Sequence, residues 1–283
     1  MQKVTKYITL NDGNKIPSVG FGTWQTPDGD VAEEAVLTAL QAGYRHIDTA
    51  KIYGNEVSVG RALKKSGIPR EEIFLTTKLW NTEHTYEKAK QSIHDQLEQL
   101  DVDYFDLYLI HWPNPVDYRE DWAKSNADSW RAMEEAVAEG KIKSIGVSNF
   151  HPHHLDALLK TAKIKPAINQ VYLNPSDQQP ELVDYFRKHD IHLEAYSPLG
   201  TGKIFDIEEL KELATKYNKS VAQLAIRWSL QHGFIPLPKS VTPERIIANL
   251  EVYDFEITEA DMAVIDAQKG KSGEARNPDE LQF

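Results

Sequence analysis

Four side chains could together deliver a proton to a carbonyl oxygen: Asp48, Tyr53, Lys78 and His111. A phenol titrates near ~10, so Tyr53 alone would be a weak proton donor at neutral pH. An ammonium group ~4 Å away favours the phenolate by up to ~4 kcal/mol at an effective dielectric constant near ~20. We expect Lys78 to supply that charge and lower the pKa of Tyr53, with Asp48 keeping Lys78 protonated and oriented. A neutral His111 would add a hydrogen-bond donor for the substrate oxygen.

Such a group suits the addition of hydride to a carbonyl, because the developing alkoxide must be stabilised and then protonated. No side chain donates hydride, so this chemistry requires a cofactor. Each residue taken alone has a simpler explanation, since a single Asp or Lys at a strand end is usually a solvated rim residue. The set as a whole therefore carries the prediction.

Most of the predicted strands end, on their C-terminal side, in a polar residue. Burial of an apolar strand does not require a polar residue at that position. The set comprises Asp48, Lys78, His111, Ser148, Asn149, Asn169, Gln170, Tyr196, Ser197, Lys239 and Ser240. In a parallel barrel these ends converge on one rim, where such folds build their active sites.

The elements that must position these residues alternate between short apolar strands and longer amphipathic helices. A hairpin is expected around the turn 11–14, and Gly43 suits the position after the first helix. Strands are predicted at 19–24, 45–48, 73–78, 104–111, 142–147, 167–172, 192–196 and 234–238. Helices are predicted at 31–42, 56–65, 86–100, 128–139, 152–161, 180–189, 222–231, 243–249 and 259–266.

Eight strand–helix alternations predict an α/β fold, and closing the strands into a (β/α)8 TIM barrel removes both sheet edges. The barrel would carry an N-terminal β-hairpin and a C-terminal helix. No composition break or Gly/Ser linker divides the 283 residues, so residues 1–283 are expected to form one domain.

Composition narrows the possible partners. The formal net charge of −11 disfavours general binding to nucleic acid or anionic membranes. The absence of cysteine excludes disulfides, thiolate metal sites and a cysteine nucleophile. The N-terminus lacks the apolar stretch of a secretory signal, and no run of ~18 apolar residues occurs. We expect a soluble cytoplasmic monomer that acts on a small molecule and holds no metal.

Five segments in register resemble the aldo-keto reductase superfamily. The segments 43–60, 145–150 and 237–249 resemble its three signatures, and Thr77-Lys78-Leu79-Trp80 and Ile110-His111-Trp112-Pro113 lie between them. Short segments after His111 and in 197–202 resemble the prokaryotic 2,5-diketogluconate reductase-like branch. The resemblance implies NADPH-dependent reduction of aldehydes or ketones, dicarbonyls and keto sugars among them, with the dinucleotide bound extended and without a Rossmann fold.

Residue by residue, the resemblance implies that Tyr53 is the general acid, Lys78 and Asp48 its partners, and His111 the group that orients the carbonyl. It places Ser148, Asn149 and Gln170 at the nicotinamide carboxamide, Tyr196 against the ring, 197–200 under the pyrophosphate, and Lys239, Ser240 and Arg245 at the 2′-phosphate. The full set implied for the cofactor is Thr23, Trp24, Asp48, Ser148, Asn149, Gln170, Tyr196, Ser197, Leu199, Gly200, Lys239, Ser240, Val241, Arg245 and Asn249. The set implied for the substrate is Trp24, Ile52, Trp80, His111 and Trp112.

Independently of the resemblance, a lysine, a hydroxyl and an arginine after the last strand would form a local anion site in an acidic chain, which favours NADPH over NADH. The chain departs from the family at Ala248, where many members place an acidic residue at the adenine. Asn249 alone would then bind the base. The short tail 270–283 predicts a reduced substrate loop.

Three other patterns compete with this interpretation. Gly20-Phe21-Gly22 is a fragment of a dinucleotide motif, but Gln25 stands where a third glycine is required. Tyr86 and Lys90 have the spacing of short-chain dehydrogenases without the glycine-rich start. His151, His153 and His154 suggest a metal site, yet no acidic partner stands at ligand spacing, which favours a solvated helix cap. The segment 122–130 is either a lid or a plain loop.

Two function classes stay open from the residues: a carbonyl reductase, and a regulatory protein that binds the nucleotide without turnover. The intact set of four catalytic candidates favours the enzyme. A barrel hydrolase that uses Asp and His would need no nicotinamide.

Overall fold

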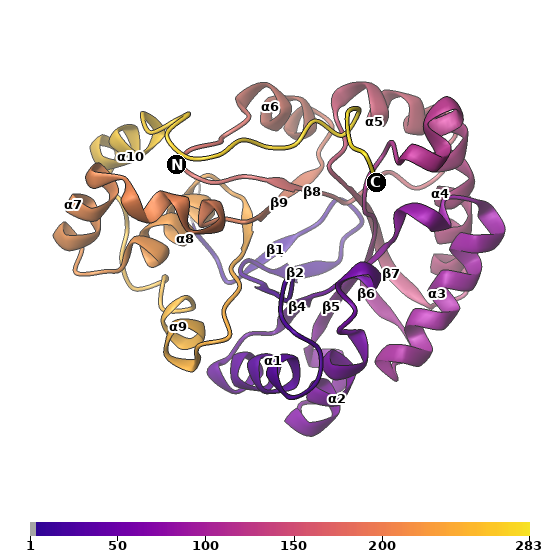
Figure 1. Cartoon of the computed structure of the whole chain (residues 1–283), viewed down its shortest axis with the longest axis horizontal. Helices are drawn as coiled ribbons and strands as arrows, with labels where there is room; N and C mark the ends of the chain where they lie inside the picture. Colours follow the sequence, from indigo (N-terminus) through magenta and orange to yellow (C-terminus); the bar gives the residue numbers. More distant parts are fainter. Residues whose placement is uncertain (1–3) are drawn as a thin grey trace.

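The computed structural model describes residues 4–283, and its centre is an eight-stranded parallel sheet rolled into a barrel (Figure 1). Sequence order and sheet order coincide, so each strand pairs with the next one along the chain. The strands are β3 (Phe21–Gly22), β4 (His46–Asp48), β5 (Phe74–Leu79), β6 (Phe105–Ile110), β7 (Ile142–Ser148), β8 (Ile168–Tyr172), β9 (His192–Tyr196) and β10 (Ile235–Leu237). The predicted barrel is confirmed.

The first and last strands meet through two backbone hydrogen bonds, from Gly20 to Pro236 and from Gly22 to Pro238, each 3.0 Å long. A Cβ on Gly20 would lie 2.5 Å from a methyl of Leu237, closer than side-chain carbons approach. Glycine therefore permits the close strand contact that closes the barrel. This packing explains the Gly20-Phe21-Gly22 pattern without any dinucleotide motif.

The helices surround the barrel (Figure 1). They are α1 (Asp30–Ala42), α2 (Glu56–Ser66), α3 (Tyr86–Leu100), α4 (Trp122–Ala138), α5 (Pro152–Leu159), α6 (Pro180–Lys188), α7 (Glu208–Lys216), α8 (Val221–Gln231), α9 (Pro243–Ala248) and α10 (Glu259–Asp266). The helix α1 ends as predicted, because Gly43 adopts a left-handed conformation and its N–H caps the last carbonyls.

Two parts of the helical prediction were wrong. The segment 122–130 is neither a lid nor a loop but the first half of α4, which follows the 3-10 turn Val116–Asp121. The helix α7 was not predicted, although Leu210, Leu213 and Ala214 bury one helical face at the i, i+3, i+4 spacing.

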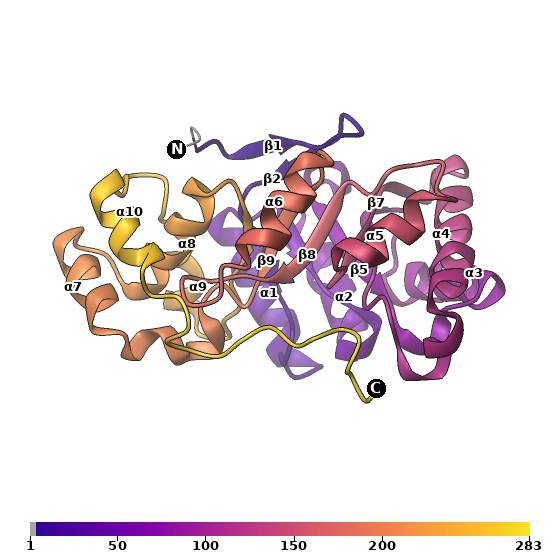
Figure 2. The same cartoon turned by 90° about the horizontal axis from the view of Figure 1, so that it is seen from above.

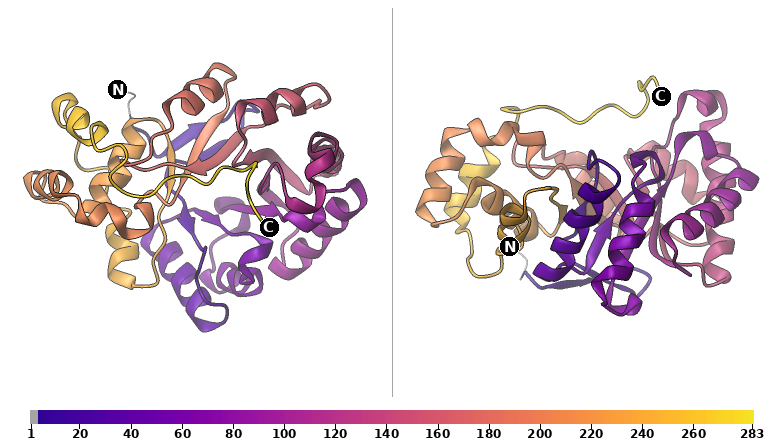
Figure 3. Two further views of the ribbon diagram at one scale, coloured as in Figure 1. Left: turned by 45° about the horizontal axis from the view of Figure 1, so that its top comes forward. Right: turned by 60° about the horizontal axis from the view of Figure 1, so that its bottom comes forward.

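The two ends of the barrel are covered differently (Figure 2). The predicted hairpin is confirmed as β1 (Tyr7–Thr9) and β2 (Lys15–Pro17), and Leu10 and Ile16 pack against the barrel interior at the end where the strands begin. At the opposite end, the tail that follows α10 runs across the barrel opening (Figure 3). That opening is where the strand ends with polar residues come together.

A larger apolar layer lies between the strands and the surrounding helices, and it includes Val36, Leu79 and Trp228. Among residues 4–283, none of the helices combines the length and the apolar character needed to cross a membrane.

Candidate active site

Four neighbouring segments place the catalytic candidates at the barrel opening. Asp48 is the last residue of β4, Lys78 lies near the end of β5, and His111 directly follows β6. Tyr53 ends the short 3-10 helix Lys51–Tyr53, which follows β4. The parallel register aligns the strand ends, so residues far apart in sequence become neighbours.

Lys78 is fully buried and surrounded by oxygen atoms. Its Nζ donates to both carboxylate oxygens of Asp48 and to the Thr49 carbonyl, each at 2.8 Å, and lies 3.5 Å from the Tyr53 oxygen. A buried ammonium requires such partners, because desolvation of a lone charge is costly. The carboxylate thus holds the ammonium beside the phenol.

The expected lowering of the Tyr53 pKa was wrong. Burial and the negative charge of Asp48 raise the pKa of Tyr53 well above its usual value of 10. Asp48 balances most of the Lys78 charge at 2.8 Å, so the phenol faces a nearly neutral ion pair. Tyr53 is consequently protonated, and Lys78 acts on it as a hydrogen-bonding neighbour.

His111 completes the group as a neutral ring. Burial and the nearby ammonium of Lys78 lower its pKa well below 6.5. Its ring meets Tyr53 edge-on at a centroid distance of 5.9 Å and Trp80 at 5.3 Å. Its Nδ1 is buried without a hydrogen-bond partner among residues 4–283. An unpaired lone pair costs less than an unpaired N–H, which favours the tautomer with the proton on Nε2.

Two residues beneath Asp48 were missed by the sequence analysis as parts of the site. Nε2 of Gln170 donates to Asp48 at 2.8 Å and to Glu194 at 2.7 Å. Burial and the Asp48 charge raise the pKa of Glu194 to about 8, while burial lowers the pKa of His46 to about 3. Both shifts favour the neutral form of these side chains, which lie next to the Asp48–Lys78 ion pair. The signal for Glu194 was a carboxylate in the middle of the buried strand β9, and that for His46 was a polar residue at the start of β4.

The residues assigned to the nicotinamide ring form a connected network. Tyr196 donates to Oδ1 of Asn149 at 2.9 Å, and Nδ2 of Asn149 donates to the His111 carbonyl at 3.0 Å. Ser148 donates to the Gln170 carbonyl at 2.7 Å. The backbone of Asn149 has a left-handed conformation, with φ of 59°. This conformation turns the side-chain amide of Asn149 back across the strand ends. Thr23 is buried at the same end and donates to the Asp48 carbonyl.

The segment expected under the pyrophosphate follows β9. Ser197 and Gly200 both have positive φ, and a turn joins the Gly200 N–H to the Ser197 carbonyl, with Leu199 between them. A Cβ on Gly200 would approach Ile204 to 3.0 Å and the Ser272 hydroxyl to 3.3 Å. That hydroxyl is buried and has no partner among residues 4–283.

The segment expected at the 2′-phosphate and adenine follows β10. Within residues 4–283, no carboxylate forms an ion pair with Lys239 or Arg245, although the chain carries a net charge of −11. Burial lowers the pKa of Lys239, whose Nζ donates to the Gln25 carbonyl at 3.3 Å. Ser240 is half-buried, Val241 is exposed and Asn249 is buried. Two uncompensated cations and a glycine-bearing turn fit a phosphorylated dinucleotide.

The residues expected at the substrate have a neighbour that the sequence analysis missed. Trp80 and Trp112 lie beside His111, while Trp24 and Ile52 are about half exposed. The C-terminal Phe283 stacks on Trp80 at 6.0 Å and meets Trp112 edge-on at 5.8 Å.

The tail is as short as the sequence predicted, and the structure adds where it lies. The tail is short but crosses the opening, and Asn81 donates to the Phe283 carbonyl at 3.2 Å. The Phe283 ring thereby lies against Trp80 and Trp112 at the barrel opening.

The competing patterns lie elsewhere. Tyr86 donates to Glu135 at 2.6 Å and Lys90 lies 3.4 Å from the same carboxylate, which makes them a surface contact between α3 and α4. The prediction that the histidines cap a helix is confirmed, because His151 is the N-cap of α5 and its N–H donates to Nδ1 of His154. The expectation of a solvated group without an acidic partner was wrong. His154 is fully buried, and its Nε2 lies 2.9 Å from Asp279, which the tail brings to the helix.

Known proteins resemble this chain over most of its length. A sequence model described as Aldo/keto reductase family matches residues 18–269. The chain is 47% identical over 276 residues to the glyoxal reductase of Bacillus subtilis (strain 168), covering 98% of this chain and 97% of that protein. It is 43% identical over 279 residues to the methylglyoxal reductase DkgA of Escherichia coli (strain K12), covering 98% and 97% respectively.

A solved structure extends the similarity to the fold. The aldo-keto reductase AKR2E4 of Bombyx mori, in complex with NADP, superposes with a TM-score of 0.87 at 36% identity. The match covers 96% of this chain and 95% of that chain.

Proposed function

Because this chain belongs to the aldo/keto reductase family, we propose that it reduces small dicarbonyl compounds with NADPH and that Tyr53 donates the proton. Family membership makes it an NADP-dependent oxidoreductase that reduces carbonyl groups. This decides between the two function classes in favour of an enzyme. The proposal adds the substrate class and the roles of individual residues.

A single observation carries the assignment of the acid: the buried contact of Lys78 with Asp48 on one side and Tyr53 on the other. A protonated phenol donates without first capturing a proton from solvent. As its O–H bond breaks, negative charge develops on the phenol oxygen 3.5 Å from an ammonium that is already oriented. Lys78 thereby stabilises the transition state more than the ground state, which is what catalysis requires.

NADPH, when bound, supplies the hydride. The neutral His111 would donate a hydrogen bond to the carbonyl oxygen and orient it toward Tyr53. Tyr53 would then protonate the same oxygen as it becomes an alkoxide. The Lys78 ammonium would then donate a hydrogen bond to the resulting Tyr53 phenolate, while Asp48 keeps Lys78 charged and in place.

We assign the cofactor to the residues that the structure lines up around the opening. Asn149, oriented by Tyr196, and Ser148 would hold the carboxamide. The turn at Gly200 would lie under the pyrophosphate, and Lys239 and Arg245 would bind the 2′-phosphate.

The substrate class follows from the pocket and from the relatives. Trp80 and Trp112 each contact both Phe283 and His111, and these aromatic rings would narrow the entrance to the site. A narrow apolar entrance that ends at polar groups favours small substrates with a second polar function. Glyoxal and methylglyoxal reductases are among the similar proteins.

We further infer that the described chain works as one domain. The hairpin closes one end of the barrel, and the tail returns to the other end after α10. The hairpin and the tail thus cover the two ends of one and the same eight-stranded barrel.

The test measures loss of NADPH absorbance with purified protein and a panel of glyoxal, methylglyoxal, simple aldehydes, ketones and keto sugars. Tyr53→Phe should abolish turnover and leave the affinity for NADPH nearly unchanged. Tyr86→Phe is the matched control, because the Tyr86 hydroxyl donates to Glu135 on α4 and belongs to the contact between α3 and α4. Wild-type rates in Tyr53→Phe would contradict the assignment of Tyr53 as the general acid. A preference for bulky monocarbonyl compounds would contradict the proposed class of small dicarbonyl substrates.

A further inference from the structure

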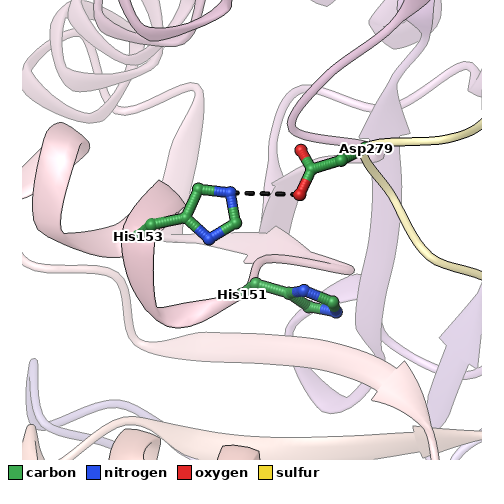
Figure 4. Close-up of side chains that lie close together, drawn as sticks. All are labelled: His151, His153 and Asp279. Carbon is green, nitrogen blue, oxygen red and sulfur yellow. Dashed lines mark ion pairs between the residues drawn. The ribbon is translucent and has the colours of Figure 1, made fainter.

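Two histidines and one aspartate that the proposed catalysis does not use lie close together (Figure 4). His151 and His153 stand at the start of α5, and Asp279 belongs to the C-terminal tail. One ligand atom from each lies within 4.8 Å of the other two. His153 Nε2 is 3.1 Å from Oδ2 of Asp279.

The second oxygen of the carboxylate is held by its own partners. His154 is fully buried, and its Nδ1 accepts a hydrogen bond from the His151 N–H at 3.1 Å. Its proton is therefore on Nε2, which donates to Oδ1 of Asp279 at 2.9 Å. Asn114 donates to the same oxygen at 2.8 Å. Oδ2 is left facing His153, as it would be in a metal site with an outer layer of orienting groups.

We propose that His151, His153 and Asp279 bind a divalent transition-metal ion such as Zn²⁺, which ties the C-terminal tail to α5. Two imidazoles and one carboxylate are a known zinc donor set and leave a fourth position for water. Tetrahedral ligands at ~2.0–2.1 Å from zinc stand ~3.3 Å apart. The observed 3.1 Å between His153 and Asp279 is close to that spacing.

The environment permits entry of a hydrated ion. The side chain of His153 is 52% exposed and that of Asp279 33% exposed, while His151 is half-buried. The ligands come from segments 126 residues apart, between 153 and 279, so the ion would crosslink the tail to the barrel. Phe283, four residues beyond Asp279, contacts Trp80 in the pocket.

Binding is tested by calorimetric titration of untagged full-length protein with ZnSO4 in a buffer free of phosphate and chelators. One ion should bind per chain, and His153→Gln and Asp279→Asn should each weaken binding at least ~10-fold. His232→Gln is the matched control, because His232 lies 2.9 Å from Asp266 in an otherwise similar pair. Co²⁺ in place of Zn²⁺ should give a visible absorption band that His153→Gln loses.

The effect on the tail is measured by trypsin cleavage after Arg276, which releases residues 277–283. Zn²⁺ should slow this cleavage several-fold in the wild type and not in His153→Gln. Since His153 is exposed, this variant should fold normally, and near-UV circular dichroism checks this for Asp279→Asn. Absence of binding, equal binding by His153→Gln, or cleavage indifferent to Zn²⁺ would each overturn the proposal.

Discussion

Replacing Asp48 with asparagine removes the charge that compensates Lys78 while keeping the size of the side chain. The Lys78 side chain is 0% exposed and that of Asp48 4%, and the two carboxylate oxygens each lie 2.8 Å from Nζ. Asp48→Asn therefore leaves an ammonium in the barrel interior with the Thr49 carbonyl and an amide oxygen as acceptors. Water cannot replace the lost charge at a site without exposed surface.

Breaking one side of a buried ion pair costs about 3–5 kcal/mol. For a chain of this size, 1 kcal/mol corresponds to roughly 2 °C in melting temperature, so Asp48→Asn should melt ~6–10 °C below the wild type. Adding Lys78→Met removes the uncompensated charge, and the double variant should recover at least ~2 kcal/mol relative to Asp48→Asn. Both variants should lose turnover by ~10²–10⁴-fold, because the proton donor loses its partner.

The assay is a thermal melt of the wild type, both single variants and the double variant at pH 7, with NADPH consumption measured at a temperature where all are folded. Asp101→Asn is the control, because the Lys64–Asp101 pair has the same 2.8 Å geometry at 79% and 72% exposure. Solvent screens an exposed pair, so this variant should melt within ~2 °C of the wild type. A double variant no more stable than Asp48→Asn would refute the reasoning.

Three further predictions concern the site. Neither Tyr53 nor His111 should change the rate of carbonyl reduction between pH 6.5 and about pH 8, because Tyr53 stays protonated up to above pH 10 and His111 stays neutral down to well below pH 6.5. A step in the pH–rate profile near pH 8 would come from Glu194, whose pKa is about 8, and Glu194→Gln should abolish that step. A fall in rate between pH 6.5 and 7.5 that persists in Glu194→Gln would contradict the neutral imidazole of His111. Phe283→Ala should raise KM for methylglyoxal by roughly 2–10-fold at nearly unchanged kcat, since an aromatic pair contributes about 0.5–1.5 kcal/mol, and an unchanged KM would place the ring outside the pocket. Arg245→Met should raise KM for NADPH by roughly 10–100-fold and leave KM for NADH unaltered. This corresponds to the loss of a charged hydrogen bond of about 1.5–3 kcal/mol to the 2′-phosphate. Equal effects on both cofactors would contradict the binding of the 2′-phosphate by Arg245.

Much of the fold and of the catalytic group could be predicted because their signals are local. Alternating apolar strands and amphipathic helices record which face of each element is buried, and this predicts the barrel. Polar residues at strand ends, such as Asp48 and Lys78, stand out against that pattern. Gly43 marks a helix end for the same reason, because only nearby backbone geometry requires it.

The charge state of Tyr53 depended on tertiary structure. The sequence indicates that an ammonium and a phenol share the site, but the pKa of Tyr53 depends on burial and on how fully Asp48 balances Lys78. Both quantities are set by distances of a few ångströms between segments that the chain brings together only on folding.

The amino-acid sequence by itself determined the alternation of elements, the strand ends that carry chemistry and the family resemblance, since each depends on residues within one element or one short motif. Only the tertiary structure decided where the tail lies. Its contacts join Asn81 to Phe283, 202 residues apart, and His154 to Asp279, 125 residues apart. Periodicity within a segment carries no information on such pairs, because packing selects them after the barrel has formed a surface to receive the tail.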